Sequence, residues 1–461
     1  MKVLFATAEL APVARVGGLA AAAAGLVGEL RRQGVDVQVA LPDYFGTPLR
    51  DERVHHLDVA PWWRPARART GHLDGVGELT LIDIPGIGRS HPYLRPDGTG
   101  WPDNEHRFFG FSAAVASLVE LVRPDVVHLN DWHTATVMAH LPSPPPTVLT
   151  IHTLGYQGRT NIGWLRAFPY RPSMFEFAGD CNPLAGGIRT ADLVITVSPH
   201  YADEIRTDEG GSGLAQILRD KGDRLVGILN GIDTDEWNPA IDSQLTATYA
   251  SDDLAPKALG RAHLLDEFGL SRGAGPVLAM VTRLVAQKGV DLVLPLVPFL
   301  AGLDARLVVL GSGDAALVAA LRAAQTDHPR EIGFHDGYDE TLAHRIFGGA
   351  DVFVMPSRFE PCGLAQMQAM RYGTLPLVTD VGGLHDTVHD VEASPAHGTG
   401  IVVPTPTSVA LMDGLHRMAR AWNQPRRRTA MQRRGMATDW SWNEPARRHV
   451  EWYDKLVVVD V

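Results

Sequence analysis

The segment ADVFVMPSRFEPCGLAQMQAMRYG (residues 350–373) contains the signal that decides the fold. It opens with an apolar run, continues through a turn that contains Pro356, and resumes after Gly363 with the spacing of a helix. A buried strand that leads into a helix through a short loop is typical of a parallel sheet. Glu360 lies in that loop, where a carboxylate withdrawn from water needs a partner.

The same pattern recurs along the chain, in one series up to about residue 196 and in a second series after about residue 275. Short apolar runs separated by helical spacing indicate strands buried on both faces, as in parallel sheets. Two such series predict an α/β protein with two Rossmann-like doubly wound domains that face a deep interdomain cleft. The runs are KVLFATA, VDVQVAL, PDVVHL, TVLTI and DLVIT in the first series and VLAMVT, RLVVLG, REIGF, DVFVM and TLPLV in the second.

Polar, weakly patterned sequence after residue 237 marks the crossing between the two predicted domains, 1–237 and 238–440. The last segment, 441–461, has the pattern of a helix with aromatic anchors. The basic run PRRRTAMQRR (425–434) has two interpretations, a solvated helix face or a patch that binds an anionic ligand.

Composition excludes several classes of protein. The formal net charge of −11 over 461 residues argues against a general nucleic-acid binder. Two cysteines are too few for a disulfide framework and fit a reducing compartment. No apolar run approaches the roughly 20 residues that cross a bilayer. The first residues, MKVLFATAEL, resemble a strand more than a signal sequence, so we expect a soluble, cytoplasmic protein.

Ligands of doubly wound sheets bind beyond the carboxyl ends of the strands, so the loops there hold the candidate residues. In the first loop, Gly17 and Gly18 open a helix predicted over 18–32, and Arg15 adds a positive charge. Exposed N–H groups at such a turn favour an anion, although a plain tight turn is the alternative. The pattern is not G-x-G-x-x-G, which argues against a nicotinamide site.

Arg283 and Lys288 follow a predicted strand of the second series. Two cations there are costly to desolvate without an anion, and a diphosphate would pair with both. The alternative is a pair of surface charges.

The helix start at Gly363 and Leu364 offers a further set of N–H groups. Glu360 beside it would repel phosphate, so neutral sugar hydroxyls are its expected partners. A structural ion pair to Arg358 or Arg345 is the alternative.

Polar residues also end strands of the first series, where Asp131 and His133 follow one strand and His152 follows another. Structural histidines are the usual interpretation. A metal site built from His128, His133 and His152 is disfavoured, because their spacing does not match H-E-x-x-H. The two halves together fit a sugar carried on a diphosphate.

These motifs resemble those of the bacterial and plant-type glycogen and starch synthases, retaining glucosyltransferases of the GT-B architecture. The resemblance runs nearly end to end. It is carried by VGGLA (16–20), NDWHT (130–134), YQG (156–158), TVSPHYADEI (196–205), ILNGID (228–233), TRLVAQKG (282–289), HRIFGGADVFVMPSRFEPCGLAQM (344–367), RYGTLPLV (371–378) and GGLHDTV (382–388).

The resemblance implies transfer of glucose from ADP-glucose to the non-reducing end of an α-1,4-glucan such as glycogen, without a metal or cofactor. It also implies that the segment 441–461 crosses back to the first domain. The residues that match the family's catalytic positions are Arg283, Lys288, Glu360, His152 and Asp131. Those that match its donor-binding positions are Arg15, Gly17, Gly18, Asn230, Cys362, Gly363, Leu364, Gly382, Gly383 and Leu384.

The chain departs from the family in two places. Arg15 stands where Lys is usual, and Ala21-Ala22 stands where Asp-Val is usual. At Gln368 related GT-B enzymes have a second Glu. The synthases also lack that Glu, so Gln368 agrees with the family. Two alternatives remain open. One is a related enzyme that uses another donor, such as UDP-glucose, or a short acceptor, and the other is a glucan-binding or regulatory protein with little turnover.

Overall fold

The computed structural model describes residues 1–459, and the fold divides into two compact units. The first unit comprises Met1–Gly231 and the chain from Trp442 onward, and the second comprises Ile232–Ser441. Asp460 and Val461, which end the predicted terminal segment, lie outside the described residues. The crossing lies ahead of residue 237, because Trp237 stacks on His344 of the second unit with 4.0 Å between ring centroids.

The first unit contains a nine-stranded sheet in which β1 lies between β2 and β6 and runs parallel to both. The chain therefore reverses its direction across the sheet between β1 and β6, the place where doubly wound sheets bind ligands. The strand order is β11 (Leu225–Gly227), β10 (Leu193–Thr196), β7 (Thr147–Ile151), β6 (Val126–Asn130), β1 (Lys2–Ala6), β2 (Asp36–Pro42), β5 (Gly77–Asp83), β4 (Ala66–Leu73) and β3 (Arg50–Leu57).

The antiparallel edge formed by β3, β4 and β5 was not predicted. Strand β3 has the sequence RDERVHHL and is exposed along its length except at Leu57. It therefore lacks the apolar run by which buried strands are recognised, while its charges suit an unpaired sheet edge.

The second unit contains a six-stranded, fully parallel sheet, and all five apolar runs of the second series form strands in it. Strand β12 lies between β13 and β15, which places the reversal between β12 and β15. The order is β14 (Ile332–Asp336), β13 (Arg306–Gly311), β12 (Val277–Val281), β15 (Val352–Met355), β16 (Leu375–Thr379) and β17 (Ile401–Val403).

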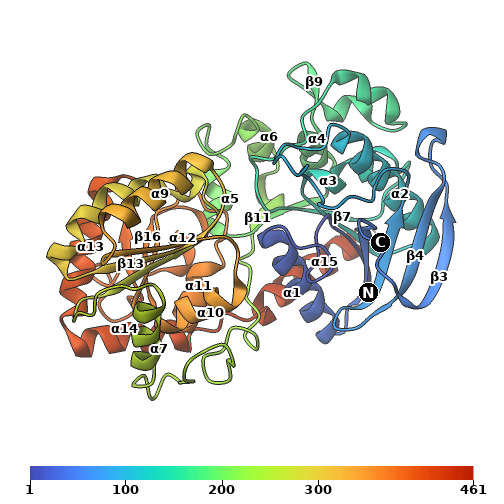
Figure 1. The fold of residues 1–461 in the computed structure, drawn as a ribbon. Helices are drawn as coiled ribbons and strands as arrows, with labels where there is room; N and C mark the ends of the chain where they lie inside the picture. Colours follow the sequence, from blue (N-terminus) through green and yellow to red (C-terminus); the bar gives the residue numbers. More distant parts are fainter. Residues whose placement is uncertain (460–461) are drawn as a thin grey trace. The chain divides into compact units, whose positions relative to one another are not determined.

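Helices cover both faces of this sheet, as Figure 1 shows around β13 and β16. The helices of the chain are α1 (Gly18–Arg32), α2 (Asn104–Val122), α3 (Asp131–Ala135), α4 (Pro183–Thr190), α5 (Pro199–Glu204), α6 (Ala215–Asp220), α7 (Lys257–Glu267), α8 (Val290–Val293), α9 (Ala315–Asp327), α10 (Glu340–Gly349), α11 (Ala365–Arg371), α12 (Gly382–Thr387), α13 (Ser408–Trp422), α14 (Pro425–Ala437) and α15 (Asn443–Val459).

Helix α15 packs into the core of the first unit, where Trp442 and Tyr453 are buried. The Tyr453 hydroxyl lies 2.6 Å from Nδ1 of His128, a buried residue of β6. Trp442 lies against Gly25 of α1, where an added Cβ would be 2.0 Å from the indole nitrogen. Trp442 and α15 therefore support both the strand that leads to Asp131 and the helix that starts at Gly18.

The basic run of α14 anchors neighbouring segments. Neither of the two interpretations made from the sequence, a solvated helix face or an anion-binding patch, included this role. Arg433 donates to the backbone carbonyl of Ser251, Arg434 to that of Gly398, and Arg427 to that of Val391. These guanidinium groups satisfy carbonyl oxygens of loops that have no regular partners.

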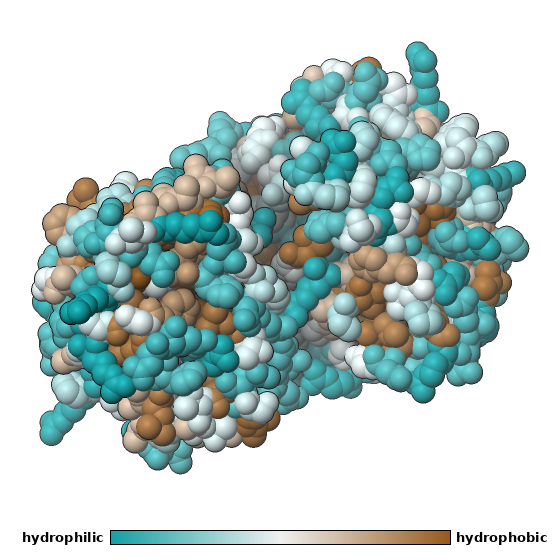
Figure 2. All heavy atoms as spheres, viewed as in Figure 1, coloured by the Kyte–Doolittle hydropathy of each residue, from teal (hydrophilic) through white to brown (hydrophobic). Residues whose placement is uncertain are grey.

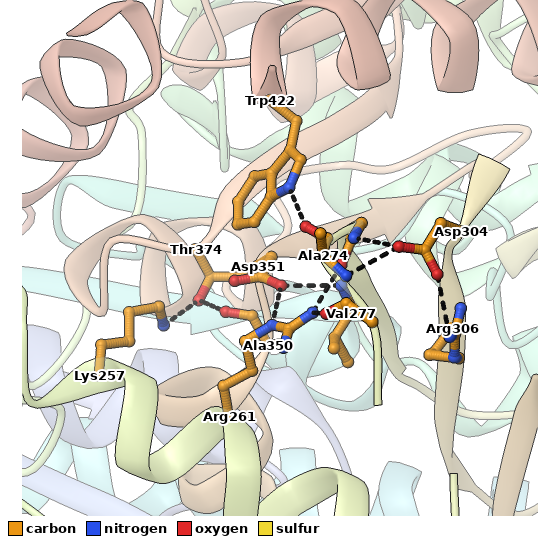
Figure 3. Close-up of polar contacts among 12 residues, drawn as sticks. Lys257, Arg261, Ala274, Val277, Asp304, Arg306, Ala350, Asp351, Thr374 and Trp422 are labelled. Carbon is orange, nitrogen blue, oxygen red and sulfur yellow. Dashed lines mark hydrogen bonds and ion pairs between the residues drawn. The ribbon is translucent and has the colours of Figure 1, made fainter. Parts of the chain in front are cut away.

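At the amino ends of the second unit's strands, buried Asp351 accepts hydrogen bonds from the N–H of Val277 and from Arg261 (Figure 3). Lys257 nearby donates to Thr374, and burial lowers its pKa to about 7. This network holds β12 and β15 together at the end of the sheet away from the candidate loops.

The face drawn in Figure 2 is mostly polar, with apolar residues scattered among polar ones. Among the described residues, none of the helices has the length and apolar character that a membrane span requires.

Two glycines of α1 test the packing of Trp442. Gly25→Ala is expected to lower the unfolding free energy of the first unit by about 1–3 kcal/mol, because its methyl group collides with the indole. Gly28→Ala, which has nothing within 4 Å of an added Cβ, is expected to raise it by about 0.5–1 kcal/mol. Urea denaturation of the full chain measures both. Equal shifts in the two variants would contradict this packing.

Candidate active site

In the second unit, Lys288 and Glu360 form an ion pair with 2.5 Å between Nζ and Oε2. The Lys288 side chain is 15% exposed and the Glu360 side chain 7% exposed, so the pair is largely shielded from water. The Ser357 hydroxyl also donates to Glu360 Oε2, at 3.0 Å. Lys288 follows β12 and Glu360 follows β15, so the pair lies at the predicted ligand-binding edge of the sheet.

The loops that carry this pair are joined by their backbones. The N–H of Arg358 donates to the carbonyl of Gln287, and the Gln287 side chain donates to the carbonyl of Phe359. Arg358 itself pairs with Asp291. The alternative in which Glu360 pairs with Arg358 or Arg345 is therefore wrong, because Arg345 pairs with Glu267 and Glu360 with Lys288.

A second close approach joins Glu360 to the glycine pair after β16. The N–H of Gly383 donates to the Glu360 carbonyl at 3.0 Å. An added Cβ at Gly383 would lie 2.1 Å from the carbonyl oxygen of Cys362, so only glycine fits there. Gly382 and the buried Leu384 flank this position at the start of α12. The structure thus brings together the predicted residues of three separate loops.

The segment before α11 presents open backbone donors. Gly363 has a φ of +72°, which favours glycine, and it is half-buried together with Leu364. The N–H groups of these two residues donate to no other residue of the described chain. Two unengaged N–H groups at a helix start can bind a phosphate oxygen.

Arg283 differs from its predicted surroundings. We expected two cations that are both costly to desolvate, but the Arg283 side chain is exposed, and no carboxylate within residues 1–459 pairs with it. The argument from desolvation therefore holds for Lys288 alone. Arg283 is available to an anionic ligand without first breaking an ion pair.

In the first unit, Asp131 is a buried carboxylate in a strained backbone conformation. It follows β6 with a φ of +54°, in the left-handed region that few residues other than glycine adopt. Its carboxylate accepts the N–H of His152 at 2.8 Å. Burial raises the pKa of Asp131 to about 7, and the nearby Glu9 carboxylate adds to this effect. Strain of this kind is frequent at functional sites.

His152 is held in one tautomer by Asn130. Its Nε2 lies 2.9 Å from Asn130 Oδ1, while Nδ2 of Asn130 donates to the carbonyl of Ala6. Because the amide oxygen can only accept, His152 carries its proton on Nε2 and leaves Nδ1 as an acceptor. Burial lowers the pKa of His152 to about 3, so the ring is neutral at physiological pH.

The first loop is organised by Glu9, which we did not single out from the sequence. Glu9 Oε2 accepts the N–H groups of Val16 and Gly17, both at 2.9 Å, and Oε1 accepts the Tyr93 hydroxyl. A phosphate would therefore compete with a protein carboxylate for the Gly17 N–H. Gly18 and Arg15 remain exposed at this turn.

The three histidines of the metal alternative have separate surroundings. His128 lies between the hydroxyls of Tyr453 and Thr150, and the ring of His133 packs at a tilt against Trp132 with 4.3 Å between ring centroids. Burial lowers the pKa of His133 to about 3. Within the described residues there is no cluster of three or more His, Cys, Asp or Glu side chains placed to hold a metal ion.

Asn230 lines a small cavity inside the first unit together with Asn130 and His152. Sequence reasoning missed Asn130, Glu9, Ser357 and Gln366, each of which touches a predicted site residue or its loop. All four lie inside segments quoted for other residues. A polar side chain within a strongly apolar or glycine-rich segment is the signal that could have identified them.

Comparisons with known proteins agree with the fold. The starch synthase catalytic domain family matches residues 2–220, and the glycosyl transferases group 1 family matches residues 266–435. The catalytic domain of starch synthase IV from Arabidopsis thaliana, solved with bound ADP and acarbose, superposes with a TM-score of 0.88 at 31% identity over 99% of each chain. A sucrose-phosphate synthase from Thermosynechococcus elongatus has the same fold, with a TM-score of 0.65 at 18% identity.

The two doubly wound sheets, each with candidate residues in the loops that follow its strands, define a glycosyltransferase of the GT-B class. Among sequence relatives, the glycogen synthase of Alkalilimnicola ehrlichii is 42% identical over 98% of each chain. That of Halorhodospira halophila is 42% identical over 99% of each chain. The chain belongs to the glycogen and starch synthase family.

The raised pKa of Asp131 predicts a pH-dependent stability. Between the ordinary carboxyl pKa of 3.8 and the folded value of about 7, the native state holds a proton that the unfolded chain has lost. Stability is therefore lost as the pH rises through this window. Asp131→Asn, which does not titrate and tolerates the left-handed conformation, should exceed the wild type in unfolding free energy at pH 8 by on the order of a few kcal/mol. The difference should shrink towards pH 4. A difference independent of pH would contradict the assignment.

Proposed function

We propose that the chain is a glycogen synthase that transfers glucose from ADP-glucose to the non-reducing end of an α-1,4-glucan with retention of configuration. The observation that carries this proposal is the Lys288–Glu360 pair beside the open N–H groups of Gly363 and Leu364. One small region thus offers two kinds of group. A cation and backbone N–H donors suit a diphosphate, and a carboxylate suits sugar hydroxyls. The names of the relatives and the ADP bound in starch synthase IV support the choice of donor.

In this proposal the second unit binds the donor. Arg283 and Lys288 bind the diphosphate, and the N–H groups of Gly363 and Leu364, next to Cys362 in the same loop, add donors to its oxygens. Glu360 accepts hydrogen bonds from glucosyl hydroxyls, next to the turn of Gly382, Gly383 and Leu384.

The chemistry follows from the charge that develops. As the bond from the sugar to phosphate breaks, negative charge grows on the diphosphate and positive charge on the sugar ring. Lys288 is already oriented by Glu360, whose carboxylate is itself held by the Ser357 hydroxyl, so Lys288 stabilises the leaving group without reorganisation. An acceptor hydroxyl that attacks from the leaving-group side can pass its proton to the departing phosphate oxygen, which retains the α configuration.

The first unit contributes neutral and weakly acidic groups. Nδ1 of His152 can accept a sugar hydroxyl, because Asn130 fixes the proton on Nε2. Asp131 holds the backbone N–H of His152 and so positions the loop. Asn230 and the turn of Arg15, Gly17 and Gly18 complete the set of residues proposed to contact substrate from this unit.

The proposed activity predicts nucleotide release. Purified protein given glycogen and ADP-glucose, without added metal, should release ADP in a glycogen-dependent reaction, with little UDP released from UDP-glucose. Activity with UDP-glucose alone would move the chain to another donor class. Glycogen binding without release from either donor would support a glucan-binding protein with little turnover, as the Arg15 and Ala21 departures allow.

A second prediction concerns Arg283. Arg283→Ala should lower kcat by a factor on the order of 10² because leaving-group charge is less stabilised. Its stability should be nearly unchanged, since the side chain is exposed. Arg358→Ala, which removes a cation from the neighbouring loop, is the matched control and should change kcat less than about twofold. Steady-state kinetics on both variants checks this, and equal losses would refute the role of Arg283.

A further inference from the structure

Gln366 is a fully buried polar side chain in the first turn of α11, directly behind the cradle of Gly363 and Leu364. Its Nε2 donates to the carbonyl of Cys362 at 3.1 Å and to the carbonyl of Gly363 at 2.8 Å. Both acceptors are carbonyl oxygens, so the group that faces them must be the NH2 group of the amide. The orientation of the Gln366 amide is therefore fixed by its neighbours.

These two carbonyls belong to the peptide units that carry the cradle donors. In a planar trans peptide the C=O and the N–H point in opposite directions. A bond to the Cys362 carbonyl therefore directs the Gly363 N–H away from Gln366, and a bond to the Gly363 carbonyl does the same for the Leu364 N–H. One side chain thus sets the direction of both unengaged donors.

The amide oxygen of Gln366 gives independent evidence that this residue is not placed there for stability alone. Oε1 of Gln366 is buried and has no hydrogen-bond partner among the described residues. An unpaired buried acceptor costs about 1–3 kcal/mol. The same atom would lie 2.3 Å from a Cβ at Gly363, so it occupies the space that any other residue there would need.

Gln366 also connects the cradle to the glycine turn of α12. Its Nε2 lies 3.2 Å from the Thr387 hydroxyl, which donates to the carbonyl of Gly383 at 2.6 Å. The Gly383 N–H in turn binds the Glu360 carbonyl. Gln366 therefore joins the two loops that flank Glu360.

We propose that Gln366 is a positioning residue of the donor site, which holds the Cys362–Gly363 and Gly363–Leu364 peptides so that both N–H groups point at a phosphate of the nucleoside diphosphate. This inference rests on the proposed function, because that function supplies the diphosphate. Gln366 does not touch the ligand and acts through the backbone.

The test compares two buried glutamines. Gln366→Met keeps the length of the side chain but removes the donor, and it should raise the Kd of ADP at least about tenfold. Gln432 also donates from Nε2 to a backbone carbonyl, that of Gly373 at 2.9 Å, but it lies in α14 away from the cradle. Gln432→Met should lose comparable stability and change the Kd of ADP less than about twofold. Calorimetry on the full chain measures the affinities, and thermal unfolding measures stability.

Hydrogen exchange supplies a second measurement, the protection of single amides by ADP, which would not change if Gln366 had only a structural role. ADP should protect the amides of Gly363 and Leu364 in the wild type and in Gln432→Met, but not in Gln366→Met. Equal ADP affinity and equal protection in the two methionine variants would overturn the proposal.

A second variant tests the proposal if Gln366→Met fails to fold. Thr387→Val keeps the shape of the side chain and breaks the link to Gly383, so it should raise the Kd of ADP about threefold. An unchanged affinity would count against the proposal. A wild-type chain that binds no ADP would instead refute the proposed function, which separates the two failures.

Discussion

The ion pair between Lys288 and Glu360 is the interaction on which the second unit's site depends. Both side chains are largely withdrawn from water, so each would be costly to bury without the other. Their pairing brings the loop after β12 against the loop after β15 and leaves the Glu360 carbonyl to bind Gly383. A charge pair of this kind contributes little net stability compared with apolar packing. Its position at the carboxyl edge of the sheet, where ligands bind, is better explained by chemistry than by folding.

The two units differ in the chemistry that they offer. The second unit presents cations and open N–H groups, which suit the growing negative charge of a diphosphate. The first unit presents His152, kept neutral by burial, and Asp131, whose pKa is raised to about 7. These groups suit hydroxyls rather than phosphates. In the first loop, Glu9 already takes the Gly17 N–H that a phosphate would use. On this distribution of charge we propose that the diphosphate binds to the second unit.

Much of the fold follows from the sequence because parallel strands are apolar on both faces. Helix α1 begins and ends where the sequence predicts, with Leu19 and Leu26 buried. Strand β3 escapes such reasoning because its exposed edge has no apolar pattern. The sequence placed Glu360 in the loop between a buried strand and a helix, and the structure has it there, between β15 and α11. The roles of Glu9 and Gln366 depend on hydrogen bonds to backbone groups, whose directions no spacing rule contains.

A double-mutant cycle on the ion pair tests the central claim most directly. Lys288→Met, Glu360→Gln and the double variant would be compared in unfolding free energy of the second unit and in kcat for glucosyl transfer. The account predicts that Lys288→Met costs about 3–5 kcal/mol because it leaves a buried carboxylate unpaired, and that the double variant regains most of this stability. It also predicts that kcat of the double variant stays lower by a factor on the order of 10². Recovery of turnover together with stability would show that the pair serves the fold alone and would contradict the account.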